Sequence, residues 1–181
     1  KISGGILEEM FVGIGGEVLH RNTFSNFAIG AELWAVQQRD YRMLFQLRDY
    51  KATTGHINLF YEEPRSKLVF ALKGGKFLAG DSGINIDVSR KWASGLRMGV
   101  FMSRTDISEQ EFGEGSFDKG FYFNIPIESL FGTFQRGMTP FGLRPITRDG
   151  AAVINHPFKL WGITDWKSAQ TIFETWDDFY D

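Results

Sequence analysis

Apolar and polar residues alternate with a period of two through most of the chain between residues 27 and 127. This period is typical of β-strands, because successive side chains of a strand point to opposite faces of the sheet. Residues 27–37, 41–48, 56–62, 68–73, 84–89, 96–103 and 121–127 show it. Residues 6–20 form a further candidate strand, in which glycines at positions 13, 15 and 16 blur the alternation.

The connections between these segments are short and contain turn-forming residues. They are Arg39-Asp40, Glu63–Ser66, Gly74-Gly75 and Lys91–Ser94. Short turns join antiparallel neighbours, so the pattern predicts an all-β, antiparallel up-and-down fold. Periodicity alone fits a soluble β-sandwich or lipocalin-like barrel as well as a membrane barrel. A membrane-spanning helix needs about 18 or more apolar residues in a row, and the sequence contains no such run.

Three stretches depart from this rhythm. Thr105–Asp118 and Phe131–Gly142 are rich in glycine, and we predict long loops or inserts there. From Asp165, a plausible N-cap, apolar residues recur with helical spacing. We therefore predict a β-region over residues 1–154, which is the β-barrel region in the membrane-barrel interpretation, and a C-terminal extension over residues 155–181 with a short amphipathic helix.

Composition narrows the range of partners. The chain has 18 Phe, 5 Trp, 5 Tyr and 21 Gly beside only 5 Pro, which suits strands with tight turns. A net charge of −2 without a basic block argues against nucleic acid, and the absence of cysteine excludes disulfides and thiolate metal sites. In a membrane barrel, large aromatic residues near segment ends would form an interfacial girdle. The candidates are Trp34, Tyr41, Tyr61, Phe77 and Trp92.

The sequence contains no recognisable catalytic or metal-binding set. The acidic residues between Glu109 and Asp118 are numerous enough to supply the two carboxylates of a glycosidase, but nothing indicates that any of them is buried. His20, His56 and His156 lack the spacing of paired metal ligands, and we expect them on one polar strand face and in two loops. We therefore expect no enzyme activity, no metal and no cofactor.

The block Phe112–Pro126, FGEGSFDKGFYFNIP, is long enough to be specific. Together with shorter blocks it resembles the YjbH/GfcD family of outer-membrane proteins, which is associated with exopolysaccharide and capsule production in Gram-negative bacteria. The shorter blocks are Gln38-Arg39-Asp40, Thr54-Gly55-His56, Phe77–Asp81, Ser89-Arg90 and Arg144–Gly150. Members of that family are much longer, so the resemblance implies the C-terminal portion of a larger outer-membrane β-barrel.

The function that this resemblance implies is assistance in the export or assembly of an exopolysaccharide. Its expected partners are the polysaccharide, outer-membrane lipid and periplasmic or outer-membrane export proteins. Candidate binding residues in the polar interior or its loops are Arg97, Glu114, Asp118, Lys119, Tyr122, Asn124, Arg148 and Asp149. Two alternatives remain open: a structural scaffold that docks periplasmic secretion partners, and a soluble carbohydrate-binding or hydrolytic β-domain.

Overall fold

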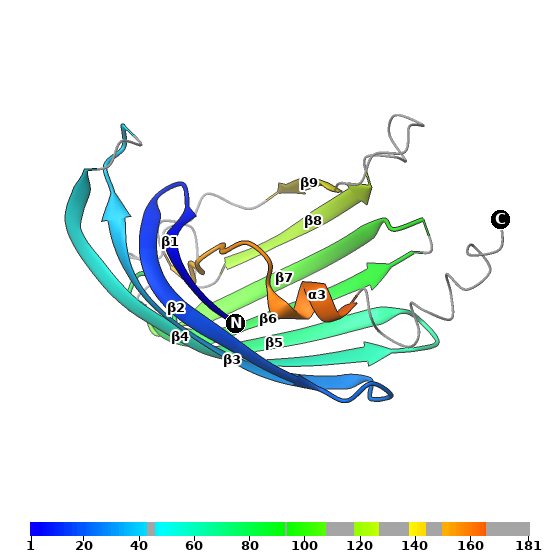
Figure 1. Ribbon diagram of the computed structural model, residues 1–181. Helices are drawn as coiled ribbons and strands as arrows, with labels where there is room; N and C mark the ends of the chain where they lie inside the picture. Colours follow the sequence, from blue (N-terminus) through cyan, green and yellow to red (C-terminus); the bar gives the residue numbers. More distant parts are fainter. Residues whose placement is uncertain (43–45, 93, 108–117, 127–137, 144–149, 166–181) are drawn as a thin grey trace.

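The computed structural model describes residues 1–42, 46–92, 94–107, 118–126, 138–143 and 150–165. Its strands form one antiparallel sheet whose spatial order follows the chain, which confirms the predicted up-and-down meander (Figure 1). The strands are β1 (Ile2–Glu8), β2 (Phe11–Arg21), β3 (Phe27–Arg39), β4 (Leu47–Glu63), β5 (Leu68–Lys76), β6 (Ser82–Lys91), β7 (Arg97–Thr105), β8 (Asp118–Pro126) and β9 (Met138–Leu143). Within the described residues β1 and β9 each pair on one side only, so the sheet is open.

The two faces of the sheet differ sharply in character. One face, which we call the outer face, carries apolar side chains that remain exposed. Ile14, Leu33, Ile57 and Val100 are each between 58% and 63% exposed. The opposite, inner face is polar, and many of its side chains are buried. They include Glu17, Glu32, Thr54, His56, Asn58, Glu62, Ser89, Ser103 and Asp118.

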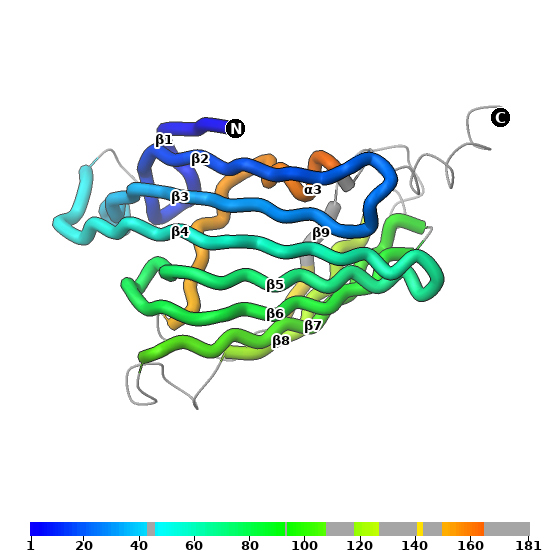
Figure 2. Tube along the Cα trace, turned by 90° about the horizontal axis from the view of Figure 1, so that it is seen from below, coloured from blue at the N-terminus to red at the C-terminus, as the bar shows by residue number. Residues whose placement is uncertain are grey.

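Residues 150–165, which we call the strap, lie over the inner face of the curved sheet. Figure 1 shows them on its concave side, and Figure 2 shows them crossing behind the strands. The strap ends in α3 (Leu160–Asp165). Ile154 packs with Trp34 and Leu78, and all three side chains are buried. In the ranges that the structure describes, no helix is long and apolar enough to cross a membrane.

Two departures from the predicted strands concern segments that contain glycines. Residues 6–20 form β1 and β2 rather than one strand, because a turn at Glu9 and Met10 separates them. Gly15 lies inside β2, where an added Cβ would meet the Trp34 ring at 2.5 Å. The predicted turn Gly74-Gly75 lies inside β5, where a Cβ on Gly75 would lie 2.1 Å from the carbonyl oxygen of Gly55. Glycine marks close backbone approach at these positions, and not a turn.

Other corrections concern where elements begin. Residues 41–48 do not form a separate strand, because Tyr41 and Arg42 lie in a turn and β4 begins at Leu47; residues 43–45 lie outside the described range. Part of the loop predicted over residues 131–142 is strand β9, which pairs with β8. The sequence pattern does not predict α3, and Asp165, the expected N-cap of a later helix, is the last residue of α3. The predicted stripe after it, residues 166–181, lies outside the described residues.

Two of the aromatic residues expected on the apolar face lie elsewhere. Trp34 is only 1% exposed and Phe77 is 0% exposed. In β3 the even-numbered residues point inward, so Trp34 shares the inner face with Glu32, two positions before it. Tyr41 and Tyr61 are exposed, as a girdle position would require, and Trp92 is half-buried.

Candidate functional site

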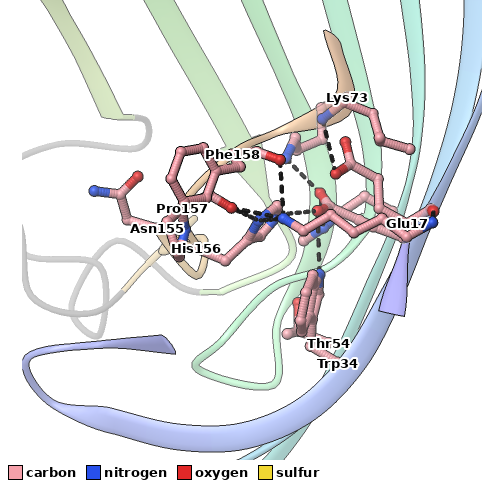
Figure 3. Close-up of polar contacts among 12 residues, drawn as sticks. Glu17, Trp34, Thr54, Lys73, Asn155, His156, Pro157 and Phe158 are labelled. Atoms are coloured by element: carbon pink, nitrogen blue, oxygen red, sulfur yellow. Dashed lines mark hydrogen bonds and ion pairs between the residues drawn. The ribbon is translucent and has the colours of Figure 1, made fainter. Parts of the chain in front are cut away.

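A buried carboxylate lies on the inner face where β3, β4 and β5 meet the strap (Figure 3). Glu32 Oε1 accepts a hydrogen bond from Lys73 Nζ at 2.6 Å and lies 3.1 Å from His56 Nδ1. Its Oε2 atom accepts from Trp34 Nε1 at 3.2 Å and lies 3.3 Å from His156 Nε2. We call these five residues the Glu32 cluster. It joins the sheet to the strap across 124 residues of sequence.

The Glu32 cluster stabilises the negative charge of Glu32, whose burial would otherwise cost free energy. The Glu32 side chain is 4% exposed, and Lys73, at 20%, supplies the opposite charge. Both imidazoles are 1% exposed, and the ring of His156 lies on Trp34 with centroids 4.4 Å apart. A buried carboxylate without partners costs several kcal/mol, so each of these donors contributes to holding Glu32 ionised on the inner face.

The first anchor of the strap is formed by the turn between β5 and β6. Asp81 is buried, and its Oδ2 atom accepts a hydrogen bond from the backbone N–H of Ala151 at 2.9 Å. The backbone N–H of Leu78 donates to the carbonyl of Ala152, also at 2.9 Å. This turn is the Phe77–Asp81 block that forms part of the family resemblance, and its role in the structure is to hold the strap.

A second anchor lies at the start of α3. The backbone N–H of Leu160 donates to Glu17 Oε2 at 3.0 Å. Next to it, Trp161 is held between two side chains of the sheet. Its ring stacks on Phe60 with centroids 4.2 Å apart and an interplanar angle of 2°, and the Arg21 guanidinium lies 4.7 Å from the ring centroid. The helix is therefore fixed by a charge, a stacked ring and a cation–π contact.

Three of the predicted binding residues, Arg97, Tyr122 and Asn124, come together on the inner face of β7 and β8. Arg97 and Asn124 are partners in the register of these strands, and all three side chains are half-buried. The Tyr122 hydroxyl donates to Asp87 Oδ1 at 3.1 Å. Arg97 Nε and Nη2 donate to Ser89 Oγ at 3.1 and 2.9 Å. These contacts connect β6, β7 and β8 without the strap.

The other predicted binding residues are placed differently. Asp118 begins β8 on the inner face, opposite Ser103, and is buried. Lys119 follows it on the outer face, opposite Met102, so the strand does not bring Lys119 together with Asp118. Glu114, Arg148 and Asp149 lie outside the described residues, as do the acidic loop between Thr105 and Asp118 from residue 108 onward and the loop over 127–137.

The Glu32 cluster as a unit is not predictable from the sequence. The alternating pattern places Glu32 and His56 each on a polar strand face, but only the register of β3 and β4 sets them opposite each other. The sequence predicts a loop at His156, and no local pattern links this residue to Glu32. Across the described part of the chain, no three His, Asp or Glu side chains are grouped so that they could hold a metal ion.

Residues 1–166 match the sequence profile of a family described as "Exopolysaccharide biosynthesis protein YbjH". The chain belongs to this exopolysaccharide biosynthesis family. A curated relative, the "Uncharacterized lipoprotein YjbH" of Escherichia coli (strain K12), is 34% identical over 172 residues, which cover 93% of this chain and 25% of the relative. The chain therefore spans about a quarter of the length of that relative. No solved structure matches.

Proposed function

We propose that this chain forms part of the wall of an outer-membrane β-barrel and that it assists the export or assembly of an exopolysaccharide without catalysing a reaction. The family relates the chain to exopolysaccharide biosynthesis, and the curated relative is named a lipoprotein, which is consistent with a protein attached to a membrane. The barrel, its location and the passage of polymer belong to the proposal.

The observation that carries this proposal is the inverted polarity of the sheet. Soluble sheets pack an apolar face on the core and leave a polar face in water. Here Ile14, Leu33, Ile57 and Val100 stay exposed on the outer face while charged and amide side chains are buried on the inner face. Contiguous apolar surface that spans many strands needs an apolar partner, and bilayer lipid is the occupant we propose.

The edges of the sheet support closure by further strands. The outer edges of β1 and β9 are unpaired among the described residues. Unpaired backbone N–H and C=O groups are not tolerated next to hydrocarbon, so a sheet in a membrane must close into a barrel. The relative is about four times as long as this chain. We propose that further strands of the full-length protein complete the barrel.

Cysteine labelling tests the membrane orientation, because this chain contains no cysteine. In otherwise cysteine-free full-length protein, spin labels at Ile57→Cys and Val100→Cys should be relaxed by oxygen dissolved in lipid. A label at Asn85→Cys, on the inner face, should be relaxed by a water-soluble nickel complex instead. Equal exposure of all three labels to the nickel complex would instead favour a soluble β-domain.

The polar inner face of β6–β8 is the polymer contact that we propose, with Arg97 and Tyr122 as its donors. In producing cells, Arg97→Gln combined with Tyr122→Phe should lower the amount of polymer at the cell surface several-fold while membrane levels of the protein stay normal. Arg104→Gln changes an exposed arginine of the same strand on the outer face and is the matched control. An unchanged amount of surface polymer in the double variant would favour the scaffold alternative. Polymer chains that are shorter in the unmodified strain than in a strain without the protein would indicate hydrolysis.

A further inference from the structure

The strap covers two aromatic rings of the sheet with rings of its own. Trp161 stacks on Phe60 and His156 lies on Trp34, with centroid distances of 4.2 and 4.4 Å. Both rings of the sheet belong to the inner face, on neighbouring strands β3 and β4. Saccharide rings present flat C–H faces that pack on aromatic rings in the same way, and their hydroxyls need donors and acceptors close by.

Such hydrogen-bonding groups lie on the same inner face of β2 and β4. His56 Nε2, Asn58 Oδ1 and Arg21 Nη1 are buried and have no hydrogen-bond partner among the described residues. Asn58 lies two positions from His56 and two from Phe60 on the same face of β4, so it sits between the two points where the strap contacts the sheet. Most buried polar atoms in proteins have a partner, so these atoms keep an unused capacity to bind hydroxyls.

We propose that the inner face of β2–β4 beneath the strap is a saccharide-binding surface, with Phe60 and Trp34 as its aromatic platforms, and that the strap and the polymer compete for it. This inference rests on the proposed function, since it takes the exopolysaccharide as the ligand. The structure represents the closed state, in which Trp161 and His156 occupy the platforms.

Competition has a defined consequence for affinity. When only a fraction of the molecules has an open strap, the apparent dissociation constant for a ligand of this surface rises in inverse proportion to that fraction. A substitution that weakens the strap without touching the platforms should therefore improve binding. Removing the stacking and the cation–π interaction of Trp161 together corresponds to about a five- to sixtyfold change in such an equilibrium.

Trp161→Leu in the full-length protein is the substitution that weakens the strap. The probe is a set of oligosaccharides prepared by partial hydrolysis of the exopolysaccharide of the producing bacterium. Binding to Trp161→Leu, measured by calorimetry in detergent, should be about five- to sixtyfold tighter than binding to the unmodified protein. Phe158→Leu is the matched control, because Phe158 belongs to the same strap and is 78% exposed. Its affinity should not change.

Phe60 needs a separate design, since it stacks on the strap in the closed state and would stack on the ligand in the open state. Replacing it alone weakens both interactions, and the two effects oppose each other. In the Trp161→Leu background Phe60 no longer stacks on the strap, so adding Phe60→Leu should weaken oligosaccharide binding by about three- to tenfold. Unchanged binding after this second substitution would show that Phe60 is not a platform and would overturn the proposal.

Hydrogen exchange gives a readout that does not depend on any substitution. In the closed state the amide of Ala151 donates to Asp81 in the turn between β5 and β6, and the amide of Leu160 donates to Glu17 of β2. Saturating oligosaccharide should displace the strap and speed exchange at both amides, whereas slower or unchanged exchange would contradict competition. If Arg97→Gln weakens oligosaccharide binding but the strap variants do not change it, this inference fails and the proposed function stands. If the unmodified protein and every variant fail to bind, both fail.

Discussion

The inner face of the sheet has two halves that satisfy their polar groups in different ways. In the half formed by β2–β5, Glu32 and Glu17 bind groups of the strap that are 124 and 143 residues away in sequence. In the half formed by β6–β8, Asp87 binds Tyr122, 35 residues away, and Arg97 binds Ser89, only 8 residues away. The first half depends on a distant segment, and the second is held by neighbouring strands.

This difference shows that one alternating pattern can produce two environments. Glu32 and Asp87 both occupy inward positions of their strands, yet Glu32 is buried beneath the strap and Asp87 is half-buried. The strap causes this difference in burial, because its described hydrogen bonds and ring contacts reach β1–β4 and the turn between β5 and β6. We therefore expect substitutions in the first half to have the larger effects on stability.

The largest effect is expected for Glu32→Gln. The substitution leaves Lys73 without its buried counter-ion and removes an acceptor of the Glu32 cluster, so the free energy of unfolding should fall by about 2–3 kcal/mol. We place the value below that of a fully buried pair because Lys73 is 20% exposed. Urea titration of the purified protein in detergent measures it. Asp49→Asn, the same acid-to-amide change at an exposed position of β4, should change stability by less than about 0.5 kcal/mol.

A smaller loss is expected in the second half for Gly99→Ala. An added Cβ would lie 2.5 Å from the Tyr122 ring, which must then move away from β7 and give up its hydrogen bond to Asp87. We expect a loss of about 1–2 kcal/mol in the same titration. A loss as large as that of Glu32→Gln would show that the two halves do not differ in the way we describe.

Tyr122→Phe distinguishes the contribution of the Tyr122 hydroxyl from that of its ring. It keeps the ring over Gly99 and removes only the donor to Asp87, so unfolding should become easier by about 1 kcal/mol. Tyr61→Phe removes a hydroxyl on the outer face, where the side chain is 44% exposed, and should have almost no effect. Equal losses in the two variants would mean that the Asp87 contact contributes nothing to stability.

The smallest effect, and one of opposite sign, is expected for Gly162→Ala in α3. No atom lies within 4 Å of the position that the added Cβ would take. Alanine favours the helical backbone over glycine, so the strap should become more stable by about 0.5–1 kcal/mol. Slower hydrogen exchange at the amide of Ile163, which donates to the carbonyl of Lys159, would report it. Faster exchange there would contradict the helical assignment.

Much of the sheet can be predicted because its information is local. A period of two shows which side chains of a strand share a face. The short turn at Pro64–Lys67 makes β4 and β5 antiparallel neighbours in the sheet. Thus the sequence places Ile57 outward and His56 inward, and both placements are confirmed. Arg97, Tyr122 and Asn124 are correctly grouped on one face for the same reason.

The parts that the sequence does not predict depend on contacts between distant residues or on ambiguous glycines. Glycine at position 75 signals a turn in sequence statistics, but in the structure it permits a close approach to Gly55 of β4. The meeting of Glu32 with His156 has no periodic signature at all. A polar inward residue looks the same in sequence whether water or a strap covers it, so the division of the inner face into two halves is not predictable.

The meander also sets the order in which the molecule is built. Every strand pairs with its neighbour in sequence, and the connections from β1 to β7 are short, so the hairpins of this part of the sheet form early and quickly. The strap is the exception, because Asn155 donates to Glu8 across 147 residues of chain. Its closure carries the highest loop entropy and has no surface to dock on until β2–β5 are assembled. We therefore expect the strap to dock after β2–β5 have formed, and its amides to gain protection later than the amides of these strands in a pulse-labelled refolding experiment.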